Sequence, residues 1–298
     1  MNYILFDGAY RDRFLPLTFT RPVAELRVGI LTIKEKWEKY LGCTCTVLTE
    51  DYLEDKFSMV EMDENVFIDA SVLPNASLAE EIEFLSENEL LLYQEEVIAF
   101  YAKSTQEEVD FASYEVKAFD GPLEQLTSLK EIVLKNADFF KQDFELLTNN
   151  KASQNLSKTN DVIAPENIFI EEGAQVEFAT INASTGPVYI SKNSLIMEGS
   201  LIRGPFFLGE NSVVKMGTKV YGATSIGPNS VIGGELKNAI IIGNSNKGHE
   251  GYLGDSIIGE WCNLGADTNC SNVKNNFSNV KVWDYEAQDF VDTGSIKF

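Results

Sequence analysis

The chain has 298 residues, of which 44% are hydrophobic and 11% aromatic, and its formal net charge is −22. This length and apolar content exclude a disordered chain and allow about two domains with buried cores. The negative charge argues against nucleic acid and anionic membranes as partners, because the field of the whole chain would repel both.

The first residues do not have the pattern of a secretory leader. Met1 to Phe6 include no basic residue, Asp7 follows too soon for a leader segment, and no apolar run is long enough to span a membrane. We therefore predict a cytoplasmic protein. The four cysteines show no metal-type spacing with a histidine and are too few for a disulfide scaffold, so we interpret them as free thiols.

The first half of the chain, residues 1–155, alternates between two patterns. Short apolar runs predict β-strands, and apolar residues at helical spacing predict α-helices. The predicted strands cover residues 3–6, 45–48, 66–68, 90–93 and 97–101. The predicted helices cover residues 30–41, a segment that begins at the capping-box pair Ser77 and Glu80, and the patterns at 126–136 and 137–147. Strands and helices in alternation favour a layered α/β domain, which we end at the polar stretch 148–155; the second domain then covers 156–298.

Four arginines lie close together near the start of this acidic protein. They are Arg11, Arg13, Arg21 and Arg27. Each guanidinium offers a planar fork of donors that suits a phosphate group. The cluster therefore predicts a site for a phosphate-bearing ligand, whereas the acidic stretch 41–110 is typical of a solvated surface.

The second half carries a repeat of six residues. Its aliphatic positions are Ile190, Ile196, Ile202, Leu208, Val214, Val220, Ile226 and Ile232. Four residues after each of the first seven stands a serine or threonine, except at Phe206. A period of six fits neither a helix nor a sheet of long strands, but it predicts a triangular solenoid whose faces are each one short strand and a tight turn. The aliphatic residues should point inward and stack into a continuous core.

After Ile232 the repeat slips by two residues. It resumes at Tyr252, Ile258, Leu264 and Cys270. We interpret the slip as an insertion, so residues 236–251 should bulge from the solenoid, and such excursions are common places for function. His249, the only histidine, lies there.

Two segments resemble a known enzyme family. Leu15 to Pro22, after a strand and a loop with Gly8 and Arg13, resembles the opening signature of sugar-1-phosphate nucleotidylyltransferases. Gly248 to Gly259, with Asn263 to Ala266, resembles the acetyltransferase half of the bifunctional UDP-N-acetylglucosamine pyrophosphorylase/glucosamine-1-phosphate N-acetyltransferase family, and the shorter bacterial variant is most similar. The resemblance implies an α/β nucleotidylyltransferase-like, Rossmann-like domain followed by a left-handed parallel β-helix of hexapeptide repeats.

The same resemblance implies a function in sugar-nucleotide biosynthesis. Acetyl-CoA would acetylate glucosamine-1-phosphate, and UTP would then uridylylate N-acetylglucosamine-1-phosphate with Mg²⁺, which yields a cell-wall precursor. It further implies a homotrimer formed through the β-helix, with acetyl-CoA along the coil. The sequence stops at Phe298 without a capping helix. One interpretation is a fragment whose β-helix is truncated at its C-terminal end and lacks part of the acetyl-CoA site; such a fragment would bind the sugar phosphate without acetylating it.

Residue roles in the second half follow from the family match. His249 is the expected general base, because an imidazole that titrates near neutral pH can take the proton of an attacking amine. Lys237 would bind the sugar phosphate, and Tyr252 and Asn272 would contact and orient the sugar. The plainer alternatives are a structural histidine, a solvated charge at Lys237 and a core position at Tyr252.

Residue roles in the first half also follow from the match. Gly8, Arg13 and Arg21 would hold the nucleotide phosphates, and Asp69 would hold the metal. The sequence departs from the family pattern in three ways: its loop has fewer glycines, Val23 replaces the usual lysine, and no glycine precedes Asp69. A missing lysine weakens the case for catalysis, so a degenerate domain that binds nucleotide weakly is an alternative.

Two other functions fit the same residues. One is a nucleotidylyltransferase for another sugar-1-phosphate, with the β-helix serving only assembly. The other is a trimeric platform without catalysis. Separate measurements of thiol and pyrophosphate release would distinguish all three.

Overall fold

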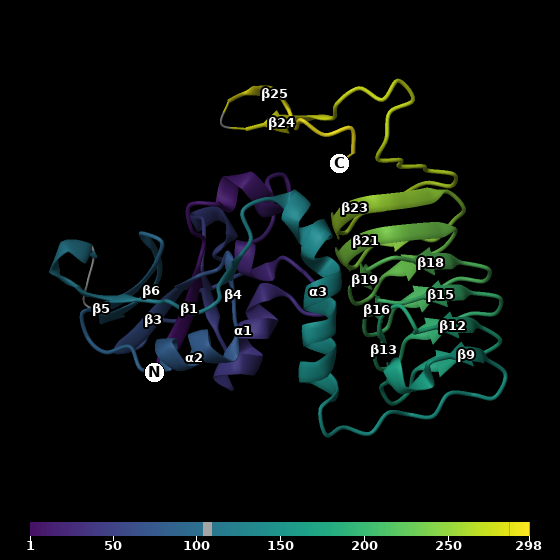
Figure 1. The fold of residues 1–298 in the computed structure, drawn as a ribbon, viewed down its shortest axis with the longest axis horizontal. Coiled ribbons are helices and arrows are strands. Elements are labelled where there is room, and N and C mark those ends of the chain that lie inside the picture. The colour runs from purple at the N-terminus through teal and green to yellow at the C-terminus, as the bar shows by residue number, and fades with distance from the viewer. Residues whose placement is uncertain (104–108, 286, 298) are drawn as a thin grey trace. The chain divides into compact units, whose positions relative to one another are not determined.

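The computed structural model describes residues 1–103, 109–285 and 287–297. The chain divides into two units: the first comprises residues 1–26 and 31–129, and the second comprises residues 27–30 and everything from residue 130 onward. Figure 1 draws both and labels many of their helices and strands.

The first unit is built on a six-stranded mixed sheet in the order β2-β1-β3-β6-β5-β7. Its strands are β1 (Asn2–Phe6), β2 (Thr46–Leu48), β3 (Glu64–Asp69), β5 (Glu89–Tyr93), β6 (Glu96–Lys103) and β7 (Glu115–Ala118). The central strand β1 is parallel to β2 and β3, and β6 runs antiparallel to β3 and β5. All five predicted strands are confirmed, and β7 is an additional one, parallel to β5.

Smaller elements complete this unit. A separate antiparallel pair joins β4 (Val72–Leu73) to β8 (Glu124–Gln125). The short 3-10 segments are η1 (Arg11–Phe14), η2 (Leu17–Phe19), η3 (Val23–Glu25), η4 (Asp51–Leu53) and η5 (Phe111–Ser113). Helix α1 (Ile33–Leu41) begins at a capping box between Thr32 and Glu35 and ends at Gly42, whose φ is 67°. The predicted helix over residues 30–41 thus ends where expected but begins three residues later, and glycine suits the position after its end because it accepts the left-handed conformation without strain.

Helix α2 (Ala76–Glu83) begins earlier than predicted. The capping residue is Asn75, whose Oδ1 accepts from the backbone N–H of Leu78 at 3.0 Å. Ser77 lies inside the helix, and its hydroxyl donates to the same Asn75 oxygen at 2.8 Å. The predicted start at Ser77 is therefore wrong, because asparagine competes well as an N-cap and it stands two positions upstream.

The second unit contains a parallel β-solenoid of about six turns over residues 161–260, consistent with the left-handed β-helix that the resemblance implies. Its strands are β9 (Asp161–Ile163), β10 (Ile168–Ile170), β11 (Gln175–Val176), β12 (Thr180–Asn182), β13 (Val188–Ile190), β14 (Leu195–Ile196), β15 (Leu201–Arg203), β16 (Phe206–Leu208), β17 (Val213–Val214), β18 (Lys219–Tyr221), β19 (Thr224–Ile226), β20 (Val231–Ile232), β21 (Glu235–Gly243), β22 (Asn246–Lys247) and β23 (Tyr252–Glu260). The segment η6 (Pro165–Asn167) lies between β9 and β10.

The predicted core of the solenoid is confirmed. Parallel pairing stacks Ile190 on Leu208 and Leu208 on Ile226, so each coil takes eighteen residues. All eight hexad residues are at most 3% exposed. The hydroxyl residues lie at the turns, where Ser194 and Thr218 each donate to the carbonyl three residues earlier at 2.6 Å. These bonds satisfy buried backbone groups that the tight turns would otherwise leave unpaired.

Asparagines shape one corner of the coil. Asn193, Asn211, Asn229 and Asn244 have φ between 50° and 57°. Asparagine tolerates this left-handed conformation better than most residues. The amides of the last three also join in a ladder: Asn211 donates to Asn229 at 3.3 Å, and Asn229 donates to Asn244 at 3.2 Å.

The expected insertion after Ile232 is wrong, because the chain there is shorter than a full coil. Ile232 pairs with Lys247, only fifteen residues further on, and Val220 pairs with Leu236 after sixteen. The segment 236–251 therefore does not bulge, since it contains most of β21 and all of β22. Parallel pairing requires only that the core positions stay aligned, so this coil loses residues at its corners and keeps its strands.

The shortened coil also changes which residue faces the core. Leu236 pairs with Leu253, which is 2% exposed, whereas Tyr252 is half-buried and pairs with Glu235. Tyr252 is therefore not a core residue, although it continues the hexad of the resumed repeat. Ile258 and Leu264 pack against the core as predicted.

Helix α3 (Leu129–Thr148) belongs to the second unit and lies beside the solenoid (Figure 1). It is one continuous helix rather than two predicted helical segments. Asn136, 1% exposed, donates to the Ala223 carbonyl at 2.9 Å and accepts from the backbone N–H of Gly29 at 2.7 Å. Asp143 accepts from the N–H of Ile30 at 2.8 Å. These bonds explain why residues 27–30 group with this unit; the predicted change of domain at residue 155 stays a prediction.

Beyond β23 the chain is mostly exposed. Isolated bridges join Asn246 to Asn263 and Leu253 to Cys270, and an antiparallel hairpin pairs β24 (Lys281–Asp284) with β25 (Asp289–Asp292) (Figure 1). All four cysteines are free thiols. Over the described ranges, no helix combines the length and the apolar character needed to cross a membrane.

Candidate functional site

The first unit has a cavity of about 480 Å³ beside the carboxyl ends of β1 and β2. Its lining includes Asp7 and Gly8, which follow β1, and Thr49 and Glu50, which follow β2. Ligands of open α/β sheets commonly bind at this edge, where parallel strands end together. Arg11 is the only basic residue of the lining, against four acidic ones. A polyanionic ligand would therefore need additional positive charge to bind here.

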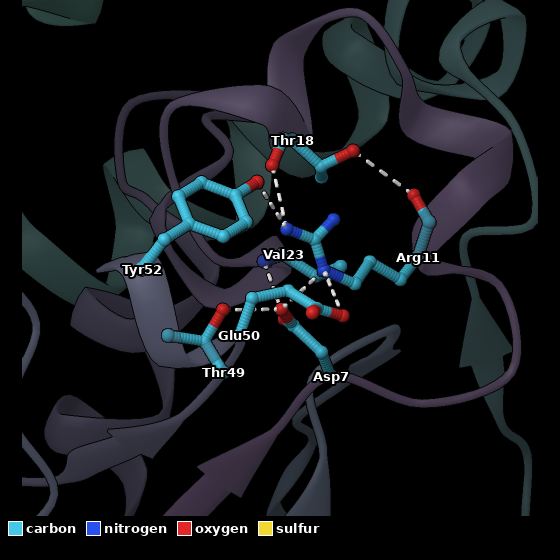
Figure 2. A network of polar contacts seen from close by, with 7 residues as sticks. All are labelled: Asp7, Arg11, Thr18, Val23, Thr49, Glu50 and Tyr52. Atoms are coloured by element: carbon cyan, nitrogen blue, oxygen red, sulfur yellow. Dashed lines mark hydrogen bonds and ion pairs between the residues drawn. The ribbon is translucent and has the colours of Figure 1, made fainter. Parts of the chain in front are cut away.

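Arg11 is held at the centre of a polar network (Figure 2). Its Nε lies 3.1 Å from Asp7 Oδ2 and 3.5 Å from Glu50 Oε1. Its Nη2 donates to the carbonyl of Thr18 at 2.8 Å and to the hydroxyl of Tyr52 at 3.2 Å. Only 8% of the residue is exposed, so these contacts fix its guanidinium group at the cavity wall.

Asp7 joins three segments of this unit. Its Oδ1 accepts from the backbone N–H of Val23 at 2.7 Å, and its Oδ2 accepts from the hydroxyl of Thr49 at 2.7 Å. Burial raises the pKa of Asp7, while these bonds and the nearby Arg11 oppose the increase. The aspartate therefore ties the end of β1 to the first residue of η3 and to the residue that follows β2.

Asp69 lies at the end of β3, next to Gly8. A Cβ at Gly8 would stand 2.1 Å from Asp69 Oδ2, so only glycine allows this close approach. Asp69 Oδ1 accepts from the backbone N–H and the hydroxyl of Ser71, at 2.8 and 2.7 Å. The residue is 6% exposed, and burial raises its pKa despite these two bonds.

The residues around Asp69 fit Mg²⁺ only in part. In the parts of the chain that the structure describes, no group of three or more His, Cys, Asp or Glu side chains could hold a metal ion. Mg²⁺ commonly binds through one or two carboxylates together with substrate phosphates. Asp69 could supply one such carboxylate, and a bound nucleotide would have to supply other ligands.

The predicted arginines do not gather at this cavity. Arg13 is exposed and lies over the ring of Tyr10, with its guanidinium carbon 5.3 Å from the ring centre. Arg21 is 4% exposed and is not part of the cavity lining. Arg27 belongs to the second unit, where it lies over the ring of Phe207. Gly8 does line the cavity, as expected for a residue that approaches a ligand.

Four of the residues that line this cavity carry no motif that predicts a role for them. They are Asp7, Thr49, Glu50 and Arg11, the last of which the sequence marks only as one member of the arginine cluster. Their common signal is position, because each lies just beyond a strand that pairs with a parallel neighbour. Val23, which replaces the family's lysine, is 1% exposed, so its side chain packs inside and only its backbone reaches Asp7.

In the second unit, Lys237 and Tyr252 lie on one outward face of the solenoid. Lys237 in β21 pairs with Gly254 in β23, and it is half-buried. A Cβ at Gly254 would stand 2.4 Å from the hydroxyl oxygen of Tyr252, so the Tyr252 ring lies over that glycine. Burial raises the pKa of Tyr252, and the charges of Asp255 and Glu235 raise it further.

Asn272 is held at the next corner of the coil. Its amide donates to Asp255 Oδ2 at 2.8 Å, and Asp255 Oδ1 accepts from the amide of Asn238 at 2.9 Å. Asp255 directly follows Gly254, so Asn272 lies beside the edge that carries Tyr252. Its expected contact with the sugar stays a prediction.

His249 lies at the corner between β22 and β23. The residue is exposed, and within the described ranges its ring makes no hydrogen bond or ion pair. Tyr252 follows three residues later at the start of β23. The four predicted residues of this half thus come from neighbouring coils: Lys237 pairs with Gly254 in the strand that begins at Tyr252, His249 stands three residues before Tyr252, and Asn272 bonds to Asp255.

Comparison with known protein families identifies the first half of the chain. Residues 3–152, just over half of the chain, match the model of a family described as sugar nucleotidyl transferase. The chain belongs to the sugar nucleotidyl transferase family. Membership places it among transferases of sugar-nucleotide biosynthesis.

The second comparison is short. The chain is 50% identical over 40 residues to the bifunctional protein GlmU of Methanococcus aeolicus. This match covers 13% of the chain and 10% of the relative, so the chain spans only about a tenth of that protein in the alignment. Together with the family match, it confirms the predicted resemblance to a GlmU-like family.

Proposed function

We propose that the protein catalyses two steps of sugar-nucleotide biosynthesis. The second half would transfer acetyl from acetyl-CoA to glucosamine-1-phosphate, and the first half would transfer uridylyl from UTP to N-acetylglucosamine-1-phosphate. The observation that carries the first of these steps is the exposed His249 at the start of an edge formed by Lys237 and Tyr252. Because UTP and acetyl-CoA are cytoplasmic metabolites, the proposal also places the protein in the cytoplasm.

In acetyl transfer, the amine nitrogen of the sugar attacks the carbonyl carbon of the thioester. The new C–N bond forms, the C–S bond breaks, and coenzyme A leaves as a thiolate that is protonated to the free thiol. His249 takes the proton that the amine loses, so no acyl-enzyme is needed. Lys237 would neutralise the sugar phosphate, and Tyr252 and Asn272 would orient the ring.

In uridylyl transfer, the sugar phosphate oxygen attacks the α-phosphorus of UTP and pyrophosphate leaves. Arg11 lines the cavity, whereas Arg13, exposed on the same 3-10 segment, would have to turn away from the Tyr10 ring to meet phosphate charge. Mg²⁺ bound with UTP would offset phosphate charge during the transfer. Asp69 would hold the ion, and the backbone at Gly8 would allow the phosphates to come close. Arg21 has the weakest support, because it is buried away from the lining.

A single assay with two readouts tests both steps. The purified protein is incubated with glucosamine-1-phosphate and acetyl-CoA, then with UTP and Mg²⁺, and free thiol and pyrophosphate are followed separately. We expect His249→Ala to lower the rate of thiol release at least about 100-fold, because general-base catalysis contributes a factor of about 10² to 10⁴ to a rate. When N-acetylglucosamine-1-phosphate is supplied directly, the release of pyrophosphate from UTP should stay unchanged.

Glu250→Ala is the matched control, because this exposed neighbour has no proposed role and its backbone carbonyl bond to Asp267 would remain. Thiol release that survives His249→Ala would contradict the proposed base. Pyrophosphate release without thiol release would favour a nucleotidylyltransferase for another sugar, and neither product would favour a non-catalytic platform.

A further inference from the structure

A lysine occupies one position in the aliphatic core of the solenoid. Parallel pairing stacks Ile196, Val214 and Ile232 in one column, and the next member of that column is Lys247. The three aliphatic residues are fully buried, and Lys247 is 1% exposed. A lysine buried this deeply is rare, since removing an ammonium group from water is costly unless its donors find partners.

Lys247 finds those partners in the backbone of two successive corners. Its Nζ donates to the carbonyl of Gly233 at 3.0 Å and to the carbonyl of His249 at 2.6 Å. Desolvation lowers the pKa of Lys247, while the charges of Glu250 and Asp267 act in the opposite direction. The ammonium group therefore bridges the corner that carries His249 and the corner directly beneath it.

The two corners are also in close backbone contact. A Cβ at Gly233 would stand 2.7 Å from the carbonyl oxygen of Gly248, and one at Gly234 would stand 2.9 Å from that of His249. Gly233 and Gly234 therefore allow the backbone of their corner to pack directly against the corner that contains His249. An aliphatic residue at position 247 would fill the core equally well, but it would leave both carbonyls without this donor.

We propose that Lys247 is a positioning residue for His249. Its ammonium group fixes the backbone corner from which the imidazole extends, and so sets where the general base meets the amine. This inference rests on the proposed function only for the catalytic role of His249. The contact itself can be tested without any activity.

The contact is tested with Lys247→Met, which keeps the length of the side chain and removes its donors. Because His249 is the only histidine, labelling histidine with ¹³C at the carbonyl gives one resonance in an NMR spectrum. We expect this resonance to shift upfield in Lys247→Met, since the carbonyl loses a charged donor. Ile232→Met is the matched control: it changes the same column one coil earlier and should leave the resonance in place.

The role is tested by thiol release in the same variants. We expect Lys247→Met to lower kcat about 10- to 100-fold, because a small displacement of a catalytic group can cost that much, with KM for the sugar phosphate nearly unchanged. In a His249→Ala background the same substitution should cause no further loss. An unshifted resonance, or an equal further loss in that background, would overturn the inference. If the wild-type protein releases no thiol, the proposed function fails and the resonance alone decides the contact.

Discussion

The backbone at Gly8 approaches the Asp69 carboxylate too closely for any side chain. We predict that Gly8→Ala displaces the carboxylate and destabilises the fold by about 1–3 kcal/mol, the usual cost of overpacking. Pyrophosphate release should fall at least about tenfold, because a displaced Asp69 could not hold Mg²⁺. Denaturant unfolding and the pyrophosphate assay measure the two effects.

Gly42→Ala provides the matched control for this prediction. Its φ is 67°, and nothing lies within 4 Å of a Cβ there, so a substitution brings backbone strain without a collision. It should cost about 1 kcal/mol and leave pyrophosphate release intact. Full activity in Gly8→Ala would show that the close approach has no part in catalysis.

The buried Asp69 should make stability depend on pH in a defined direction. Burial raises its pKa in the folded state, so the folded protein binds more protons than the unfolded chain between the ordinary aspartate pKa and the raised one. Stability should therefore fall as pH rises through this window. Asp69→Asn keeps an oxygen that can accept from Ser71 and removes the charge. We expect the variant to gain stability relative to wild type as the pH rises from about 3 to about 7.

Urea unfolding of both proteins across that range measures the difference. Asp63→Asn is the control, since Asp63 is exposed just before β3 and should show no such trend. A stability difference that does not change with pH would mean that the charge of Asp69 costs nothing in the folded state.

Among the elements, α3 carries a buried side chain, Asn136, that bonds to two backbone groups outside the helix. This amide satisfies the N–H of Gly29 and the carbonyl of Ala223, both within the second unit. We predict that Asn136→Leu lowers the free energy of unfolding by about 2–4 kcal/mol, because it leaves buried backbone groups unpaired. Leu134→Ala, at a position on the same helix that is 66% exposed, should change it by less than about 0.5 kcal/mol.

Denaturant unfolding and limited proteolysis of α3 measure this effect. Equal stability of the two variants would mean that the bonds of Asn136 contribute nothing to the free energy of unfolding. The local sequence of residues 129–148 does not distinguish Asn136 from the other polar residues of the helix, because its bonding partners lie outside the helix.

At the scale of the whole molecule, the net charge of −22 sets how copies of the chain can associate. The homotrimer that the family resemblance implies would bring together three subunits, each with this net negative charge, and salt would screen the repulsion between them. We predict a mass near three times 33.2 kDa at about 1 M salt and partial dissociation at about 0.01 M, where screening extends about 30 Å rather than 3 Å. Sedimentation measures the mass, and a monomer under both conditions would contradict the trimer.

Much of the architecture could be predicted because it depends on regular spacing. Ile190 to Ile232 identify the solenoid core, since each inward position repeats every six residues and parallel stacking keeps those positions aligned. The strands of the first sheet are equally clear, because a strand covered on both faces is a run of apolar residues such as Tyr3 to Phe6. The N-cap of α2 could not be predicted, because asparagine and serine are both favourable N-cap residues and both stand near the start of the helix, as Asn75 and Ser77. The backbone conformation in the folded protein makes Asn75 the cap.

Local pattern and linear motifs were therefore enough to predict the two kinds of fold and the aliphatic core, whereas the roles of His249 and its neighbours rest on the family motif and stay predictions. Three features come from long-range packing: the slip after Ile232 shortens a coil, Lys247 enters the core, and Asp7 and Arg11 line the cavity. These features depend on which distant residues come together, as when Asp7 meets Thr49 or Lys247 meets Gly233. Burial and pairing across such separations leave no periodic trace in the chain, so spacing alone could not reveal them.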